Sequence, residues 1–161
     1  MEPFMGGGEM IREVSKEMST WNDIPWKFEA GTSNIAQVIG LGAAIDYIEK
    51  LTIEKISAYE KELLSYAQSK LQELPGITIF GDAKEKGAII SFNIQDIHPH
   101  DIAHILDTGG IAIRAGHHCA QLVMKHLQVA ATNRVSFYIY NSFSEIDSLV
   151  NNLNKAINLF K

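Results

Sequence analysis

Apolar residues recur every three or four positions along several stretches of the chain, the spacing that places them on one face of an α-helix. This pattern predicts helices over residues 34–50, 53–74, 100–107, 120–127 and 144–160. Pro75-Gly76 would end the second helix, because proline cannot continue a helix and glycine favours the turn beyond it. Ser144 is the expected N-cap of the last helix.

Between these helices the apolar period shortens to two, and β-branched and aromatic residues become frequent. The pattern predicts strands over residues 77–80, 88–94, 111–114 and 134–140. This order of elements indicates an α+β fold in which helices cover one face of a small, mostly antiparallel sheet. Residues 1–33 show neither period, and we expect an irregular arm whose aromatic residues, Trp21 and Trp26, pack against another surface.

The composition narrows the class of protein. The 161 residues carry a net charge of −5, which argues against broad nucleic-acid binding because such proteins have a basic surface. A single cysteine cannot form an internal disulfide, and the N-terminal residues lack the pattern of a signal peptide. No apolar run approaches the length of a membrane span. We therefore expect a cytoplasmic protein with no membrane association.

The cysteine lies in the segment Arg114-Ala115-Gly116-His117-His118-Cys119-Ala120. A thiol acts as a nucleophile in its thiolate form, and nearby positive charge or a helix N-terminus favours that form. Arg114 and the two histidines are able to supply the positive charge, and the helix predicted after the cysteine is able to supply the N-terminus. On residue type alone, however, a free cysteine is commonly a small buried hydrophobe. The local sequence leaves these two interpretations open.

Histidines near the cysteine also suggest a metal site. The candidate ligands are His98, His100, His104, His117, His118 and Cys119. Their spacing matches no standard zinc module, so we expect no metal here.

Two further segments have both a structural and a functional interpretation. Gly31-Thr32-Ser33-Asn34 precedes a predicted helix, where it either forms a simple N-cap or binds a phosphate through backbone amides. Arg134 opens a largely apolar strand, where a guanidinium is either paired structurally or free to bind a carboxylate in a bidentate manner.

Taken together, the motifs are more specific than any one of them. In the C-terminal part they are Arg-x-Gly-His-His-Cys-Ala at 114–120, Arg134-Val135-Ser136-Phe137 and Tyr140-Asn141. In the N-terminal part they are residues 6–11, 26–34 and 39–44. This set, in order along essentially the whole chain, resembles the Suf-type cysteine desulfurases and the related selenocysteine lyases. These are pyridoxal-phosphate enzymes of aminotransferase class V.

The resemblance implies a fold like the C-terminal small domain of fold-type I pyridoxal-phosphate enzymes. It also implies roles for individual residues. Cys119 would take the sulfur of L-cysteine as a persulfide and leave L-alanine, with His118 shaping its loop and assisting proton movement. Arg134, assisted by Arg114, would bind the substrate carboxylate. Gly31 and Thr32 would reach the cofactor phosphate of the neighbouring subunit in a homodimer.

The sequence departs from this family in two respects. The family commonly has a proline two to three residues after the cysteine, where this sequence reads Ala120-Gln121-Leu122-Val123, and the larger departure concerns the cofactor lysine. The family forms its Schiff base with a lysine in a Ser-x-His-Lys context within a large N-terminal domain, and this sequence has no such lysine. We therefore interpret residues 1–33 as the remnant of a junction with that domain and residues 34–161 as the small domain. We expect this chain alone to bind no pyridoxal 5'-phosphate and to be inactive.

The leading hypothesis is accordingly the C-terminal fragment of a cysteine desulfurase that supplies sulfur for iron–sulfur cluster assembly. The partners implied are a second copy of the chain and a sulfur-acceptor protein. The alternative hypothesis is a non-catalytic sulfur-carrier or interaction module that uses Cys119.

Overall fold

Residues 1–81 and 83–160 are described by the computed structural model. They form two units, Met1–Leu51 and Thr52–Lys161, and each is described here by itself.

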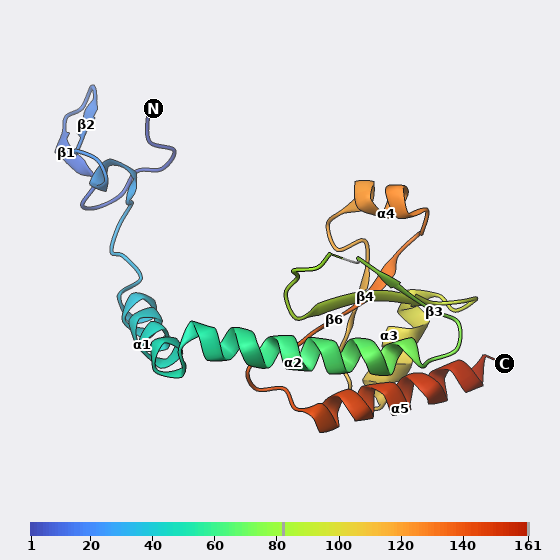
Figure 1. Cartoon of the computed structure of the whole chain (residues 1–161). Coiled ribbons are helices and arrows are strands. Elements are labelled where there is room, and N and C mark those ends of the chain that lie inside the picture. Colours follow the sequence, from blue (N-terminus) through green and yellow to red (C-terminus); the bar gives the residue numbers. More distant parts are fainter. Residues whose placement is uncertain (82, 161) are drawn as a thin grey trace. The chain divides into compact units, whose positions relative to one another are not determined.

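An antiparallel four-stranded sheet is the centre of the C-terminal unit (Figure 1). Its strands are β3 (Ile77–Phe80), β4 (Ile89–Ile94), β5 (Arg114–Gly116) and β6 (Thr132–Ser136). They lie in the order β3-β4-β6-β5, so β4 and β6 are the two central strands. The predicted α+β fold with a small antiparallel sheet is confirmed.

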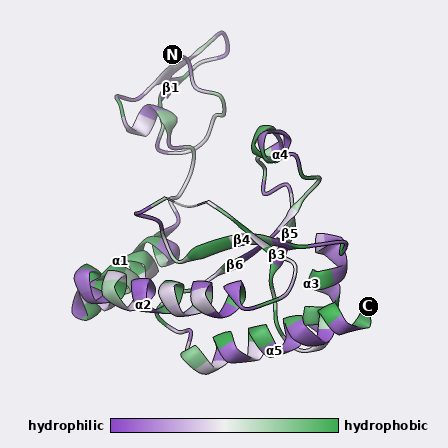
Figure 2. Cartoon of the chain, turned by 45° about the vertical axis from the view of Figure 1, so that its right-hand side comes forward, coloured by the Kyte–Doolittle hydropathy of each residue, from purple (hydrophilic) through white to green (hydrophobic). Residues whose placement is uncertain are grey.

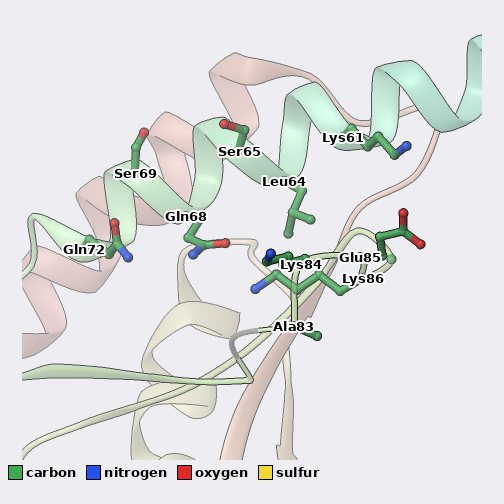
Figure 3. Close-up of a pocket in the computed structure, with 11 residues that line it drawn as sticks. Lys61, Leu64, Ser65, Gln68, Ser69, Gln72, Ala83, Lys84, Glu85 and Lys86 are labelled. Carbon is green, nitrogen blue, oxygen red and sulfur yellow. The ribbon is translucent and has the colours of Figure 1, made fainter.

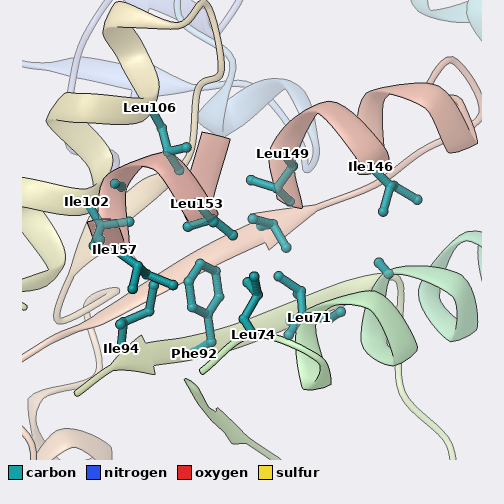
Figure 4. Packing of buried hydrophobic residues seen from close by; sticks show 14 of the residues in the cluster. Leu71, Leu74, Phe92, Ile94, Ile102, Leu106, Ile146, Leu149, Leu153 and Ile157 are labelled. Carbon is teal, nitrogen blue, oxygen red and sulfur yellow. The ribbon is translucent and has the colours of Figure 1, made fainter. Parts of the chain in front are cut away.

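Three helices cover one face of this sheet: α2 (Ile53–Gln72), α3 (Pro99–Thr108) and α5 (Phe143–Leu159). Alternate residues of β4 point toward them, because successive side chains of a strand lie on opposite faces. Phe92 and Leu153 are fully buried at the centre of the core (Figure 4). Burial of a large apolar side chain contributes roughly 1.5–3 kcal/mol, so this face stabilises the unit.

The opposite face of the sheet carries polar side chains. Ser91 of β4 lies opposite Arg134 of β6, and Arg134 lies opposite Arg114 of β5. These three residues therefore form a row across the strands on the face that the helices leave open. The short helix α4 (Gln121–Leu127) lies on the far side of the sheet from α5 (Figure 1).

Both β5 and β6 are displaced from their predicted positions. The structure places β5 at Arg114–Gly116 instead of 111–114, and β6 at Thr132–Ser136 instead of 134–140. Ala115, Gly116 and Asn133 have weak strand propensity, and of these four paired residues only Thr132 favours a strand. Backbone pairing within the sheet thus overrides local propensity at this end.

The N-terminal unit contains more regular structure than its sequence suggests. Within the arm predicted to be irregular, β1 (Ile11–Val14) and β2 (Ser19–Trp21) form an antiparallel hairpin. A short 3₁₀ helix follows at Trp26–Phe28, and α1 spans Ile35–Leu51. The domain boundary predicted after residue 33 stays a prediction.

Helix α1 is rich in apolar residues (Figure 2). Many of their side chains are exposed. Ile39 is 69% exposed and Val38 is 62% exposed, although neither is a residue that favours contact with water. Exposed apolar surface of this kind is typical of a face that contacts other protein. No helix among the described residues is long and apolar enough to cross a membrane.

The N-cap of α5 is Ser142, and the prediction of Ser144 was wrong. The Ser142 hydroxyl accepts a hydrogen bond from the Glu145 amide at 3.4 Å, and the Ser142 amide donates to a Glu145 carboxylate oxygen at 2.8 Å. This reciprocal capping box lowers the pKa of Glu145 below its usual value, chiefly through the bond from the Ser142 amide. Three residues beyond Ser144 lies Asp147, whose carboxylate accepts a hydrogen bond from the Tyr66 hydroxyl, and apolar periodicity does not distinguish it from Glu145.

We expect Ser142→Ala to lower the free energy of unfolding by about 1 kcal/mol, the usual cost of losing an N-cap. Ser144→Ala is the matched control, and it should change that free energy by less than about 0.5 kcal/mol. Urea unfolding of both variants measures the difference. Equal losses, or a larger loss for Ser144→Ala, would contradict the assignment of the cap.

Candidate active site

Cys119 lies in the turn between β5 and α4. The Ala120 amide donates to the His117 carbonyl oxygen at 2.9 Å, which closes a turn around His118 and Cys119. Both central residues have positive φ, 54° for His118 and 58° for Cys119. Residues other than glycine adopt this conformation at a cost, commonly about 1–3 kcal/mol each, and they do so where the surroundings hold them.

The thiol is exposed, so the interpretation of Cys119 as a buried hydrophobe is wrong. Arg114 donates from Nη2 toward the Cys119 Sγ at 3.7 Å. The turn, Arg114 and the first residues of α4 line a cavity of about 570 Å³. An accessible sulfur thus lies beside a guanidinium at this hollow.

Two guanidiniums lie next to each other on the open face of the sheet. Arg114 and Arg134 are direct cross-strand partners, and like charges in that position destabilise a sheet. The Nε atom of Arg134 is buried and has no hydrogen-bond partner among the described residues. This combination is typical of a site that binds an anion, because a carboxylate would satisfy the guanidinium and offset the repulsion.

His118 is attached to the sheet at Thr132. Its Nε2 lies 2.9 Å from the Thr132 hydroxyl oxygen and 3.0 Å from the Thr132 carbonyl oxygen. Desolvation lowers the pKa of His118 below its usual value of 6.5, and the charges of Arg134, Arg114 and His117 lower it further, while the bond to the carbonyl opposes them. Burial and the neighbouring positive charges therefore favour the neutral form of the His118 imidazole.

The other two predicted site residues, Gly31 and Thr32, belong to the N-terminal unit. Gly31 has a φ of +81°, which favours glycine, and its amide donates to the Gly8 carbonyl oxygen at 2.9 Å. That amide is thus already bonded, while Thr32 is exposed just before α1. Both the N-cap and the phosphate interpretation of this segment are compatible with this geometry.

The histidines do not gather into a metal site. His98 and His100 stack at the start of α3, with ring centroids 5.4 Å apart, and the His98 Nδ1 accepts from the His100 amide. Among residues 1–81 and 83–160, no three His, Cys, Asp or Glu side chains lie close enough together to hold a metal ion.

A second hollow of the C-terminal unit lies between α2 and the loop after β3 (Figure 3). It has a volume of about 1080 Å³, and its lining includes Lys61, Lys84 and Lys86. None of the predicted site residues lines it, so the candidate site is the smaller hollow around Cys119.

Comparison with known proteins identifies the family of this chain. Residues 1–149 match the family described as aminotransferase class V. This chain belongs to the class V aminotransferase family. A probable cysteine desulfurase of Halalkalibacterium halodurans is 52% identical over 160 residues, which are 99% of this chain and 39% of that protein. The chain thus spans about two fifths of the length of the curated relatives it matches, and it corresponds to their C-terminal part.

Two solved structures share the fold. The cysteine desulfurase CsdA of Escherichia coli superposes with a TM-score of 0.89 at 38% identity, covering 99% of this chain and 39% of that one. A cystine C–S lyase variant, C-DES K223A, with glycine covalently linked to its pyridoxal-phosphate cofactor, superposes with a TM-score of 0.72 at 21% identity, covering 94% and 37%. The second likeness supports the fold only.

The site does not fit the family cofactor by itself. Pyridoxal phosphate needs a lysine amine for its Schiff base. The lining of the hollow around Cys119 runs from Arg114 to Val123 and contains no lysine. The hollow therefore holds the Cys119 thiol and the Arg114 guanidinium, with Arg134 on the neighbouring strand, and its lining lacks the amine that would attach the cofactor.

Two residues of the site were missed by sequence reasoning. Thr132 precedes the predicted strand, and Ser91 lies inside an apolar one, so neither stands out by pattern. Only cross-strand register places Ser91 opposite Arg134 and brings Thr132 to the turn that carries Cys119.

The lowered pKa of His118 gives a pH dependence of stability. Between the pKa of His118 in the folded protein and its usual value of 6.5, the unfolded chain binds more protons than the folded chain. The contribution of His118 to the free energy of unfolding is therefore fully present above pH 6.5 and is lost as the pH falls through the pKa of the folded protein. We expect His118→Gln to lose less unfolding free energy than the unchanged protein between about pH 7.5 and about pH 5.5. Denaturant unfolding at both pH values measures the loss.

His104→Gln is the control, because His104 is exposed on α3. That variant should keep the pH dependence of the unchanged protein. A His118→Gln protein with the same pH dependence as the His104→Gln protein would show that folding does not lower the pKa of His118.

Proposed function

We propose that this chain is the C-terminal part of a cysteine desulfurase and carries its sulfur-accepting half of the active site. The observation that supports this most strongly is the exposed Cys119 thiol beside Arg114, which pairs across the strands with Arg134. The Nε of Arg134 has no hydrogen-bond partner in the described part of the chain. The 52% identity to a probable cysteine desulfurase supports the choice of reaction. We do not favour a sulfur-carrier module, because the match to the enzymes runs along nearly the whole chain.

In the proposed reaction, L-cysteine and the Cys119 thiol give L-alanine and a Cys119 persulfide. The carbon–sulfur bond of the substrate is replaced by a carbon–hydrogen bond, and a sulfur–sulfur bond forms on Cys119. The substrate sulfur becomes the outer, sulfane sulfur, so no external oxidant or reductant is required. Arg114 stabilises the thiolate that accepts the sulfur.

Arg134 binds the substrate carboxylate in this proposal, and Arg114 assists. A carboxylate accepts two parallel hydrogen bonds from one guanidinium, which fixes both its position and its orientation. Such positioning accelerates a reaction because the substrate is already oriented next to the reacting group. His118 keeps the turn in place through the bond of its Nε2 to Thr132.

The remaining components lie outside the site described above. Pyridoxal 5'-phosphate and its Schiff-base lysine would be held by the part of the longer relatives that this chain does not cover. Gly31 and Thr32 would contact the cofactor phosphate across a homodimer, and the exposed apolar side chains of α1 fit burial against other protein. A sulfur-acceptor protein of iron–sulfur assembly and a cytoplasmic location complete the proposal.

A chimera tests this function. The C-terminal 39% of the Halalkalibacterium halodurans protein is replaced by this chain, which matches it over 160 residues. We expect the purified chimera to form L-alanine from L-cysteine, measured by amino-acid analysis. Cys119→Ser in the chimera should abolish turnover, because a hydroxyl is a far weaker nucleophile at neutral pH.

This chain by itself, mixed with pyridoxal phosphate and L-cysteine, is the second arm. It should show no Schiff-base absorbance and release no sulfide. A folded chimera that makes no alanine, or activity of this chain alone, would contradict the proposed function.

Arg134 gives a separate prediction in the chimera. Arg134→Lys keeps the positive charge but loses the planar, bidentate geometry. We expect kcat/KM for L-cysteine to fall about tenfold or more, mainly through a higher KM, as expected for one lost charged hydrogen bond. Steady-state kinetics measure this, with Arg12→Lys as the matched control because Arg12 is exposed in the N-terminal hairpin. An unchanged KM in Arg134→Lys would remove Arg134 from carboxylate binding.

A further inference from the structure

The turn that carries Cys119 is strained and exposed, so something must hold it. His118 and Cys119 both have positive φ, and α4 begins directly after them without a side-chain cap at Ala120. Two side-chain contacts fasten this turn to the sheet in the described part of the chain. One is the contact of Arg114 with Cys119, and the other joins His118 to Thr132.

Thr132 is well placed to act as the fixed end of the second contact. It is fully buried in the central strand β6, so its position is set by the sheet. It lies two residues before Arg134, and residues two apart in a strand share one face. The anchor of the turn and the proposed carboxylate-binding guanidinium thus lie side by side on one strand.

The hydrogen bonds have a definite direction. The Thr132 carbonyl oxygen can only accept, so the His118 Nε2 carries the proton and donates to it. The Thr132 hydroxyl oxygen, at 2.9 Å, accepts from the same N–H group. Removing the Thr132 hydroxyl leaves the His118 imidazole with one hydrogen-bond partner instead of two. The backbone of His118, which has positive φ, is then held less firmly.

We propose that Thr132 is a positioning residue that acts through His118 to hold the Cys119 thiol beside Arg114. This inference rests on the proposed function in taking Cys119 as the reactive thiol. Thr132 touches neither the substrate nor the sulfur. Its hydroxyl fixes the ring of His118, and the ring fixes the turn.

Alkylation of Cys119 tests this with no cofactor or substrate. The second-order rate constants of iodoacetate and iodoacetamide are measured on this chain. The ratio of the iodoacetate to the iodoacetamide rate constant reports positive charge near the sulfur, because iodoacetate is an anion and iodoacetamide is neutral. We expect the ratio to be about fivefold higher in the native protein than in the urea-unfolded chain, the effect of one neighbouring charge in water. Thr132→Val should bring the ratio close to the unfolded value.

The conservative variant and the control separate the hydroxyl from general packing. Thr132→Ser keeps the hydroxyl, so its ratio should stay within about twofold of the native value, as the charge at Arg114 is unchanged. Thr78→Val makes the same chemical change at an exposed position of β3 and should leave the ratio unaltered. Circular dichroism before each reaction shows that the variant is folded.

Should Thr132→Val fail to fold, His118→Phe decides, because it removes the donor from the partly exposed end of the contact. It should lower the ratio as Thr132→Val would. A native ratio in folded Thr132→Val or His118→Phe overturns the inference, and so does a ratio in Thr132→Ser as low as in Thr132→Val. An inactive chimera with these alkylation results would contradict the proposed function and leave the role of Thr132 standing.

Discussion

Burial of the sheet on one face is the constraint on which the C-terminal unit depends. Ile90, Phe92 and Ile94 of β4 alternate into a core formed with α2, α3 and α5. Because strand side chains alternate, the same pairing that buries these residues presents Ser91, Arg134 and Arg114 on the other face. The core thus determines where the functional side chains lie, although none of them contributes to it.

Several features of β5, β6 and the turn after β5 lower the stability of the fold. Two guanidiniums lie opposite each other, and the turn after β5 holds two consecutive residues at positive φ. Asn133, between Thr132 and Arg134, lies opposite Phe92 on the core face and is fully buried, and neither its Nδ2 nor its Oδ1 has a partner among the described residues. Unsatisfied buried polar groups and like charges both cost free energy. Such costs gather where a ligand or a reaction requires the geometry.

Much of the fold follows from periodicity, while the site does not. The long helices α2 and α5 and the strand β4 follow from apolar spacing, because burial on one face imposes that spacing. The displaced strand β5 and the cap at Ser142 depend on pairing and on local hydrogen bonds, which apolar periodicity does not report. Cys119, Arg114 and Arg134 could be proposed from residue chemistry, but their proximity and the role of Thr132 require the register of β5 and β6. Gly31 and Thr32 remain assignments by resemblance.

The central claim is that the thiol of Cys119 accepts the sulfur of the substrate. The most direct measurement is the mass of the peptide containing Cys119 after the chimera has reacted with L-cysteine labelled with heavy sulfur. The account predicts one labelled sulfur atom on Cys119, removable by a reducing agent, and none on the same peptide of the Cys119→Ser protein. Labelled sulfide in solution with an unmodified Cys119 at every time point would contradict it.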